Sequence, residues 1–169
     1  AKRIGVSTKS ASRCFDELEY LNIDVLGMKG KSRVINIPDD REQLWQQIEN
    51  VLRNPVIRRF VLREDKKLEK KAGISALCEY SLLSDNVYPT YAVTKKELKD
   101  SGVKVEKQVS ELEEIGCVVL ELGYFIDFLG KGFQDPLSVV LSFTGEEQEE
   151  ERIDISINEM LEEYVWSKD

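Results

Sequence analysis

Side chains able to contact both bases and phosphates gather in one short stretch near the start of the chain. Its hydroxyl and cationic residues are Thr8, Lys9, Ser10, Ser12 and Arg13. Arginine and lysine donate hydrogen bonds to base edges and phosphates, and the hydroxyls of serine and threonine can bind either. The mixture predicts contact with double-stranded DNA. Lys9, Ser10, Ser12 and Arg13 would reach base edges, and Thr8 would hold a phosphate.

The same stretch predicts the helix that would carry these side chains. Ser7 suits an N-cap, because its hydroxyl can accept a free amide of the first turn. Apolar residues then recur at three- and four-residue spacing and form one stripe: Ala11, Cys14, Phe15, Leu18 and Leu21. Residues 2–5 fit the end of a preceding helix and a turn at Gly5. We expect a helix-turn-helix, although an ordinary helical hairpin with a charged outer face explains the pattern equally well.

Two β-prone runs, residues 23–27 and 32–38, follow this helix and flank a basic turn. Their β-branched residues and the glycines at the bend predict a hairpin. We expect its cations, Lys29, Lys31 and Arg33, to meet phosphates while the helix enters the major groove.

Residues 1–38 therefore resemble the winged helix-turn-helix regulators in the broad sense, including the MarR-like group of bacterial regulators. The resemblance implies a recognition helix followed by a basic wing. A winged helix normally has another helix before this point, so we expect the DNA-binding unit to be incomplete at its start.

The charge is unevenly distributed along the chain. Residues 1–71 carry 16 Lys or Arg against 11 Asp or Glu, whereas residues 72–169 carry 8 against 21, for an overall charge of −8. This asymmetry favours a part that faces nucleic acid and an acidic part that phosphate would repel. Two solvated surfaces of different sign would give the same numbers.

Composition excludes several classes of site. The chain has no histidine, which rules out zinc sites that use histidine and acid–base catalysis by histidine within it. Cys14, Cys78 and Cys117 are widely spaced among apolar neighbours, which predicts buried free thiols in a reducing cytoplasm. No run of residues is apolar enough to suggest a membrane span.

The rest of the chain predicts an α+β protein in which a small α/β domain follows the winged helix. We expect residues 1–38 to form the partial DNA-binding domain, residues 39–55 a linker helix from Arg41 to Leu52, and residues 56–169 a domain for sensing, oligomerisation or partner binding. Strands are predicted at residues 56–63, 88–93 and 116–125, with the last one central.

Helices are predicted at residues 72–83 and at residues 153–165. A further helix is predicted to begin at a capping box formed by Thr94 and Glu97. Asp135-Pro136 predicts a further helix start, although residues 139–143 fit a strand as well. Residues 103–114 fit either a helix or an irregular connection, and residues 146–151 fit a solvated acidic loop.

The order Gly73-Ile74-Ser75-Ala76-Leu77, helix, loop and a strand that ends in Thr94 resembles the middle of the AbiEi-type antitoxin regulators. The resemblance spans about residues 72–98. It implies a winged helix paired with an α/β domain, and it carries no catalytic signature.

Little in the second half suggests catalysis. Glu121 and Asp127 could hold a metal, but the lysine that a nuclease site would add is missing, and residues 129–133 fit a flexible turn better than a phosphate loop. We therefore expect no enzyme, cofactor or metal.

The sequence favours a DNA-binding regulator, and a homodimer is one form that it could take. One alternative is an antitoxin whose acidic half binds a basic toxin. Another is an adaptor that uses the winged helix to bind protein.

Overall fold

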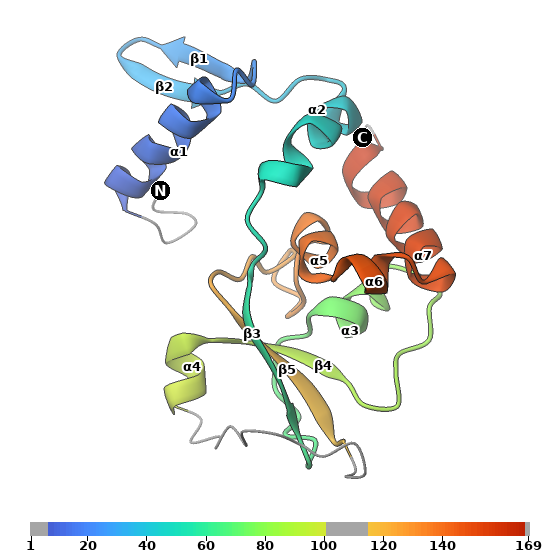
Figure 1. The fold of residues 1–169 in the computed structure, drawn as a ribbon. Helices are drawn as coiled ribbons and strands as arrows, with labels where there is room; N and C mark the ends of the chain where they lie inside the picture. The colour runs from blue at the N-terminus through green and yellow to red at the C-terminus, as the bar shows by residue number, and fades with distance from the viewer. Residues whose placement is uncertain (1–6, 101–114, 168–169) are drawn as a thin grey trace. The chain divides into compact units, whose positions relative to one another are not determined.

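The computed structural model describes residues 7–100 and 115–167 and has a mixed α+β fold with two small sheets. The chain divides into two compact units, residues 1–52 and residues 53–169 (Figure 1). The predictions for residues 2–5 and 103–114 lie outside the described residues. No helix in the described ranges is long and apolar enough to cross a membrane.

Helix α1, Thr8–Tyr20, begins as its sequence predicts. The amide of Ser10 donates to Ser7 Oγ over 3.0 Å, which confirms the N-cap. At the other end Asn22 adopts a left-handed φ of 54°, and the amide of Ile23 donates back to the carbonyl of Leu18. This pattern closes a helix with a Schellman motif, in which asparagine tolerates the left-handed position.

The apolar stripe of α1 is less covered than predicted. Ala11, Phe15 and Leu18 are half-buried, and no residue of this helix is fully buried. The prediction of a buried thiol is wrong for Cys14, which is exposed, whereas Cys117 is buried.

Strands β1, Leu26–Lys29, and β2, Ser32–Ile35, form the predicted antiparallel hairpin. Lys29 pairs with Ser32 across a two-residue turn, where Gly30 has a φ of 63° that favours glycine. The first strand begins three residues later than predicted. The reason is that Ile23 closes the preceding helix, and its side chain is buried there.

Helix α2, Arg41–Ile48, starts at the Asp40 cap and passes into a 3₁₀ turn, η2, Glu49–Val51. The predicted helix up to Leu52 therefore tightens in its last turn. Trp45 is the buried side chain of α2.

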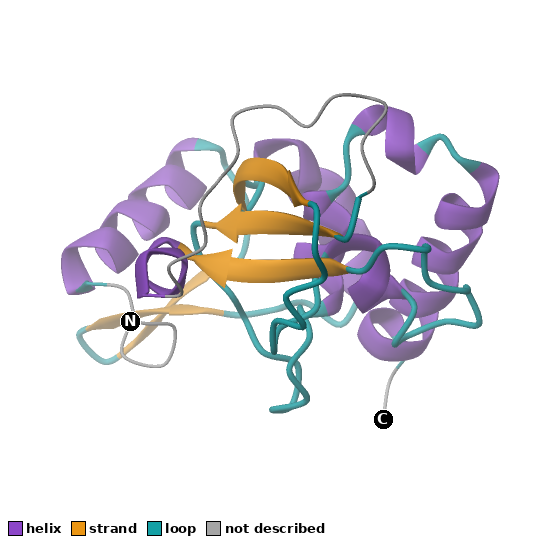
Figure 2. Ribbon diagram, turned by 90° about the horizontal axis from the view of Figure 1, so that it is seen from below, coloured by secondary structure: helices purple, strands orange, loops and turns teal. Residues whose placement is uncertain are grey.

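A three-stranded sheet forms the centre of the second unit (Figure 2). Strands β3, Val56–Leu62, and β4, Thr90–Thr94, lie on either side of β5, Cys117–Leu122. Strand β3 is antiparallel to β5 and β4 is parallel to it. This order confirms the prediction that the most apolar strand, β5, lies at the centre of the sheet.

Helices precede, connect and follow these strands: α3, Gly73–Leu77; α4, Lys95–Asp100; α5, Pro136–Ser142; α6, Gly145–Gln148; α7, Glu151–Leu161; and the π turn η3, Glu162–Trp166. The capping box at Thr94 and Glu97 and the Asp135 cap are confirmed. Residues 139–143 are not a strand, since α5 runs to Ser142. Part of the predicted acidic loop is helix α6, which has its own capping box at Thr144 and Glu147.

The sheet is covered on both faces. On one face Phe60, Val93 and Val119 pack with Leu68 and with Leu98 of α4. On the other face the core contains Ala92 and Leu120. A third cluster fills the space between α3, α5 and α7, including Leu77, Val139 and Met160.

Helix α3 differs from the prediction in length. It ends at Leu77, and residues 78–82 continue as turns and bends. Leu82, which falls within the helix predicted at residues 72–83, lies outside α3 and is fully exposed. The helical spacing of apolar residues therefore continues in the sequence after the helix itself has ended at Leu77.

Candidate nucleic-acid interface

The outer face of α1 presents the cations that the sequence predicts for DNA. Lys9 and Arg13 are exposed, and their spacing of four residues places them one turn apart on the same face. This face lies opposite the half-buried Ala11 and Phe15. Within the described residues Lys9 and Arg13 form no ion pair, so both charges are available to an anion.

The hydroxyl residues at the start of α1 are only partly available. Thr8 is the exposed first residue of the helix. The Ser10 hydroxyl lies 2.9 Å from the hydroxyl of Ser7, so it already shares a hydrogen bond at the cap.

The hairpin carries two further cations at its tip. Lys29 ends β1, Lys31 lies in the turn, and both are exposed. Neither forms an ion pair with any residue that the structure describes. Met28 beside them is also largely exposed.

Arg33 has partners that the sequence did not reveal. From β2 its guanidinium donates to Asp16 Oδ1 over 2.6 Å and to Ser12 Oγ over 2.8 Å. It also lies 5.2 Å from the centre of the Phe15 ring, at cation–π range. The structure thus brings two predicted DNA contacts, Ser12 and Arg33, against one another, where they connect the hairpin to the helix.

No local pattern marks this connection, because Asp16 and Arg33 are 17 positions apart. Only the paired charges of the two elements could have suggested it. The predicted contacts of Ser12 with a base and of Arg33 with a phosphate stay predictions.

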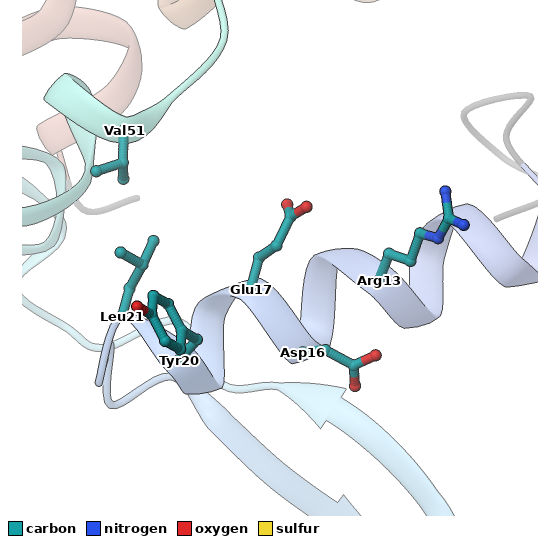
Figure 3. A pocket seen from close by; sticks show the side chains of 6 residues that line it. All are labelled: Arg13, Asp16, Glu17, Tyr20, Leu21 and Val51. Carbon is teal, nitrogen blue, oxygen red and sulfur yellow. The ribbon is translucent and has the colours of Figure 1, made fainter.

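A hollow of about 490 Å³ borders the same helix. Figure 3 shows Arg13 and Glu17 on one side of α1 and Asp16 on the other, with Tyr20 and Leu21 at the helix end, toward Val51. The carboxylates of Asp16 and Glu17 would repel phosphate. The cations suited to an anion are therefore those of the N-terminal half of α1 and those of the hairpin tip, and Arg13 lies on the side of α1 opposite Asp16, which holds the hairpin (Figure 3).

The uneven charge along the sequence does not correspond to the two units of the structure. Residues 1–52 carry 8 Lys or Arg and 8 Asp or Glu, so the positive excess of residues 1–71 lies in residues 53–71. Those cations are mostly paired inside the second unit. The ion pairs are Arg58–Glu121, Arg59–Glu147, Lys66–Glu64, Lys70–Glu97 and Lys71–Glu79. The charge asymmetry along the sequence is largely neutralised in space.

Glu121 and Asp127, the two candidate metal ligands of the sequence, each hold a hydrogen bond within the fold. Glu121 is buried on β5 and accepts a hydrogen bond from Arg58. Asp127 accepts the amide of Gly132 over 2.9 Å, which closes the turn at residues 127–132. Among the described residues no group of histidine, cysteine or acidic side chains is arranged to hold a metal.

No protein-family model, no curated protein and no solved structure matches this chain with statistical significance.

Proposed function

We propose that this chain is a DNA-binding regulator in which α1 is the recognition helix of a winged helix and the β1–β2 hairpin is its wing. The proposal is carried by Lys9 and Arg13, which lie on the exposed face of α1 and form no ion pair with the described residues. This helix is tied to a hairpin that has Lys29 and Lys31 at its tip. A helix with such a face fits the major groove, and the hairpin cations are then near the phosphate backbone.

The side chains divide into two roles. Lys9, Ser10 and Arg13 contact base edges, since they occupy the N-terminal half of the helix. Thr8, Lys29 and Lys31 contact phosphates and contribute affinity without reading sequence. Arg33 sets the angle between the helix and the hairpin through Asp16, and so determines whether both can touch one duplex.

The test is a selection of duplexes from a random library by the full chain, followed by fluorescence anisotropy on the selected sequence. We expect an enriched motif bound at least about 10³-fold more tightly than random duplex. The Lys9→Ala/Arg13→Ala variant should lose that preference.

The matched control is Lys95→Ala/Lys96→Ala, which removes the same charge from exposed positions of α4. This control should keep the preference for the motif. No enrichment with the intact chain, or an equal loss in both double variants, would refute the proposal.

A further inference from the structure

A groove of about 920 Å³ lies in the second unit, between the turn after α3 and the C-terminal helices. Residues 79–82 form one wall. The other wall is a single face of α7 and η3, because its lining residues recur every three or four positions: Ile155, Asn158, Glu159 and Glu162. The opposite face of α7 is buried through Ile153, Ile157, Met160 and Leu161.

The groove exposes apolar side chains on both walls. Leu82 is 100% exposed on one wall and Ile155 is 50% exposed on the other. Between them Tyr80 is buried and makes edge contacts with the rings of Phe133 and Tyr164. A single exposed leucine is ordinary in proteins, but an exposed leucine facing an exposed isoleucine across a groove forms an apolar strip.

The rim of this strip is acidic. Glu159, Glu162 and Glu163 line the groove, and within the described part of the chain none of them forms an ion pair. Glutamates elsewhere in the unit, such as Glu121 and Glu147, are paired with arginines. Among the residues that the structure describes, no lysine or arginine lines the groove, although Glu79 on its other wall is paired with Lys71. The carboxylates of Glu159, Glu162 and Glu163 therefore have no cationic partner among the described residues.

We propose that this groove binds a basic amphipathic helix of a protein partner. The apolar side of such a helix would cover Leu82 and Ile155, and its lysines or arginines would meet the row of glutamates on α7 and η3. Helices recognised in this way place apolar anchors at three- and four-residue spacing, so that a single face of the partner would cover the strip.

A macromolecule fits this groove better than a small molecule. Sites for small molecules enclose most of the ligand surface, whereas Leu82 stands fully exposed at the rim. The proposal does not depend on DNA binding, because every residue that lines the groove belongs to the second unit.

The test uses the full chain and a fluorescent synthetic helix of about 18 residues, or about five turns, made only of leucine and lysine. Its leucines share one helical face. A scrambled peptide of the same composition has the same charge and no apolar face. We expect the amphipathic peptide to bind more tightly than the scrambled peptide in anisotropy titrations.

Variants locate the binding. Leu82→Ser and Glu159→Gln/Glu162→Gln should each weaken the amphipathic peptide by about tenfold or more, since they remove an anchor or its charge partners. Two matched controls lie outside the groove. Val87→Ser changes a side chain as exposed as Leu82, and Glu146→Gln/Glu149→Gln removes the same charge from exposed positions. Both should stay within about twofold of wild type.

Equal binding of the two peptides, or equal weakening by the control variants, would mean that diffuse negative charge attracts the probe, and would overturn the proposal. Absence of binding to the wild-type chain would overturn it as well. The Lys9→Ala/Arg13→Ala variant should bind the peptide like wild type. The peptide test therefore stands or fails independently of the test of DNA binding.

Discussion

Arg33 of β2 and Asp16 of α1 form an ion pair, with Nη1 2.6 Å from Oδ1. The same guanidinium donates to Ser12 on that helix. One side chain therefore ties the hairpin to the helix at two points a turn apart. A variant that breaks this connection can therefore test whether the position of the hairpin affects DNA binding, without changing the charge of the hairpin.

Asp16→Ala should weaken DNA binding about threefold, equivalent to ~0.6 kcal/mol, although it removes a negative charge from the proposed interface. The physical reason is that Arg33 loses its charged partner and keeps only Ser12 and the Phe15 ring, so the hairpin is held less firmly against α1. Anisotropy on the selected duplex measures the effect. Because Asp16 is 62% exposed, the loss in free energy of unfolding should stay below about 1 kcal/mol.

Glu17→Ala is the control for that variant. Glu17 is exposed on the same helix and forms no ion pair within the described residues, so its removal should strengthen DNA binding slightly. If both variants strengthen binding, Arg33 does not position the hairpin.

Arg13→Ala should weaken binding to the selected duplex by about 1–3 kcal/mol and relax the preference at one base position. Arg13 lies on the exposed face of α1, where its guanidinium can reach a guanine edge. The measurement is anisotropy on a set of duplexes with single base changes. The same loss on selected and random duplex would contradict a base contact.

Lys31→Ala should lower affinity equally for every duplex, because in the proposed complex a lysine at the hairpin turn would meet the backbone and not a base. The slope of log affinity against log salt concentration should fall by about one. Titrations at several salt concentrations measure it. An unchanged slope would exclude a phosphate contact at this residue.

Glu147→Gln should make the stability of the chain less dependent on pH. Burial favours a raised pKa for Glu147, but hydrogen bonds from Arg59 and Thr144 outweigh it and hold the pKa below its usual value. A lowered pKa stabilises the fold above the ordinary pKa of about 4.3, and this contribution is lost as the pH falls through the lowered value.

We therefore expect Glu147→Gln to cost about 1 kcal/mol at neutral pH and almost nothing well below pH ~4. Urea unfolding at a series of pH values measures the difference. Glu146→Gln, a change at the exposed neighbouring position, should cost little at any pH. A cost that is constant with pH would show that Glu147 acts through packing alone.

Gln134→Ala should destabilise the second unit by about 2–4 kcal/mol. The side chain is completely buried, accepts from the amide of Gly73 and donates to the Ser138 carbonyl and the Ser142 hydroxyl. Its removal leaves a cavity and unpaired polar groups between α3 and α5. Gln148→Ala, which loses one hydrogen bond from a half-buried position, should cost less than about 1.5 kcal/mol in the same thermal or urea unfolding. Similar costs at both positions would contradict this account.

The sequence predicts those parts of the fold that depend on neighbouring residues. The caps at Ser7 and Asp135 and the box at Thr94 and Glu97 are confirmed, since a cap needs only an acceptor at the right distance along the chain. The central place of β5 follows from its continuous apolar run, which requires cover on both faces.

Features that depend on distant residues could not be predicted. The position of Leu82 is an example, because helical spacing continues in the sequence after the helix has ended at Leu77. The charge of residues 53–71 is another, since the partners of Arg58 and Arg59 lie 63 and 88 positions away. For the candidate site, the exposed cations of α1 were predictable, whereas the bond between Arg33 and Asp16 was not.

The strand order β3-β5-β4 has a consequence for synthesis on the ribosome. Both outer strands emerge first, yet neither pairs with the other, so the sheet has to wait for residues 117–122. Until then Phe60 and Leu62 lack their cross-strand partners, Val119 and Cys117, which leaves apolar strand surface open to aggregation. A nascent chain stalled before Cys117 should be far more sensitive to protease than one stalled after the C-terminal helices have left the exit tunnel.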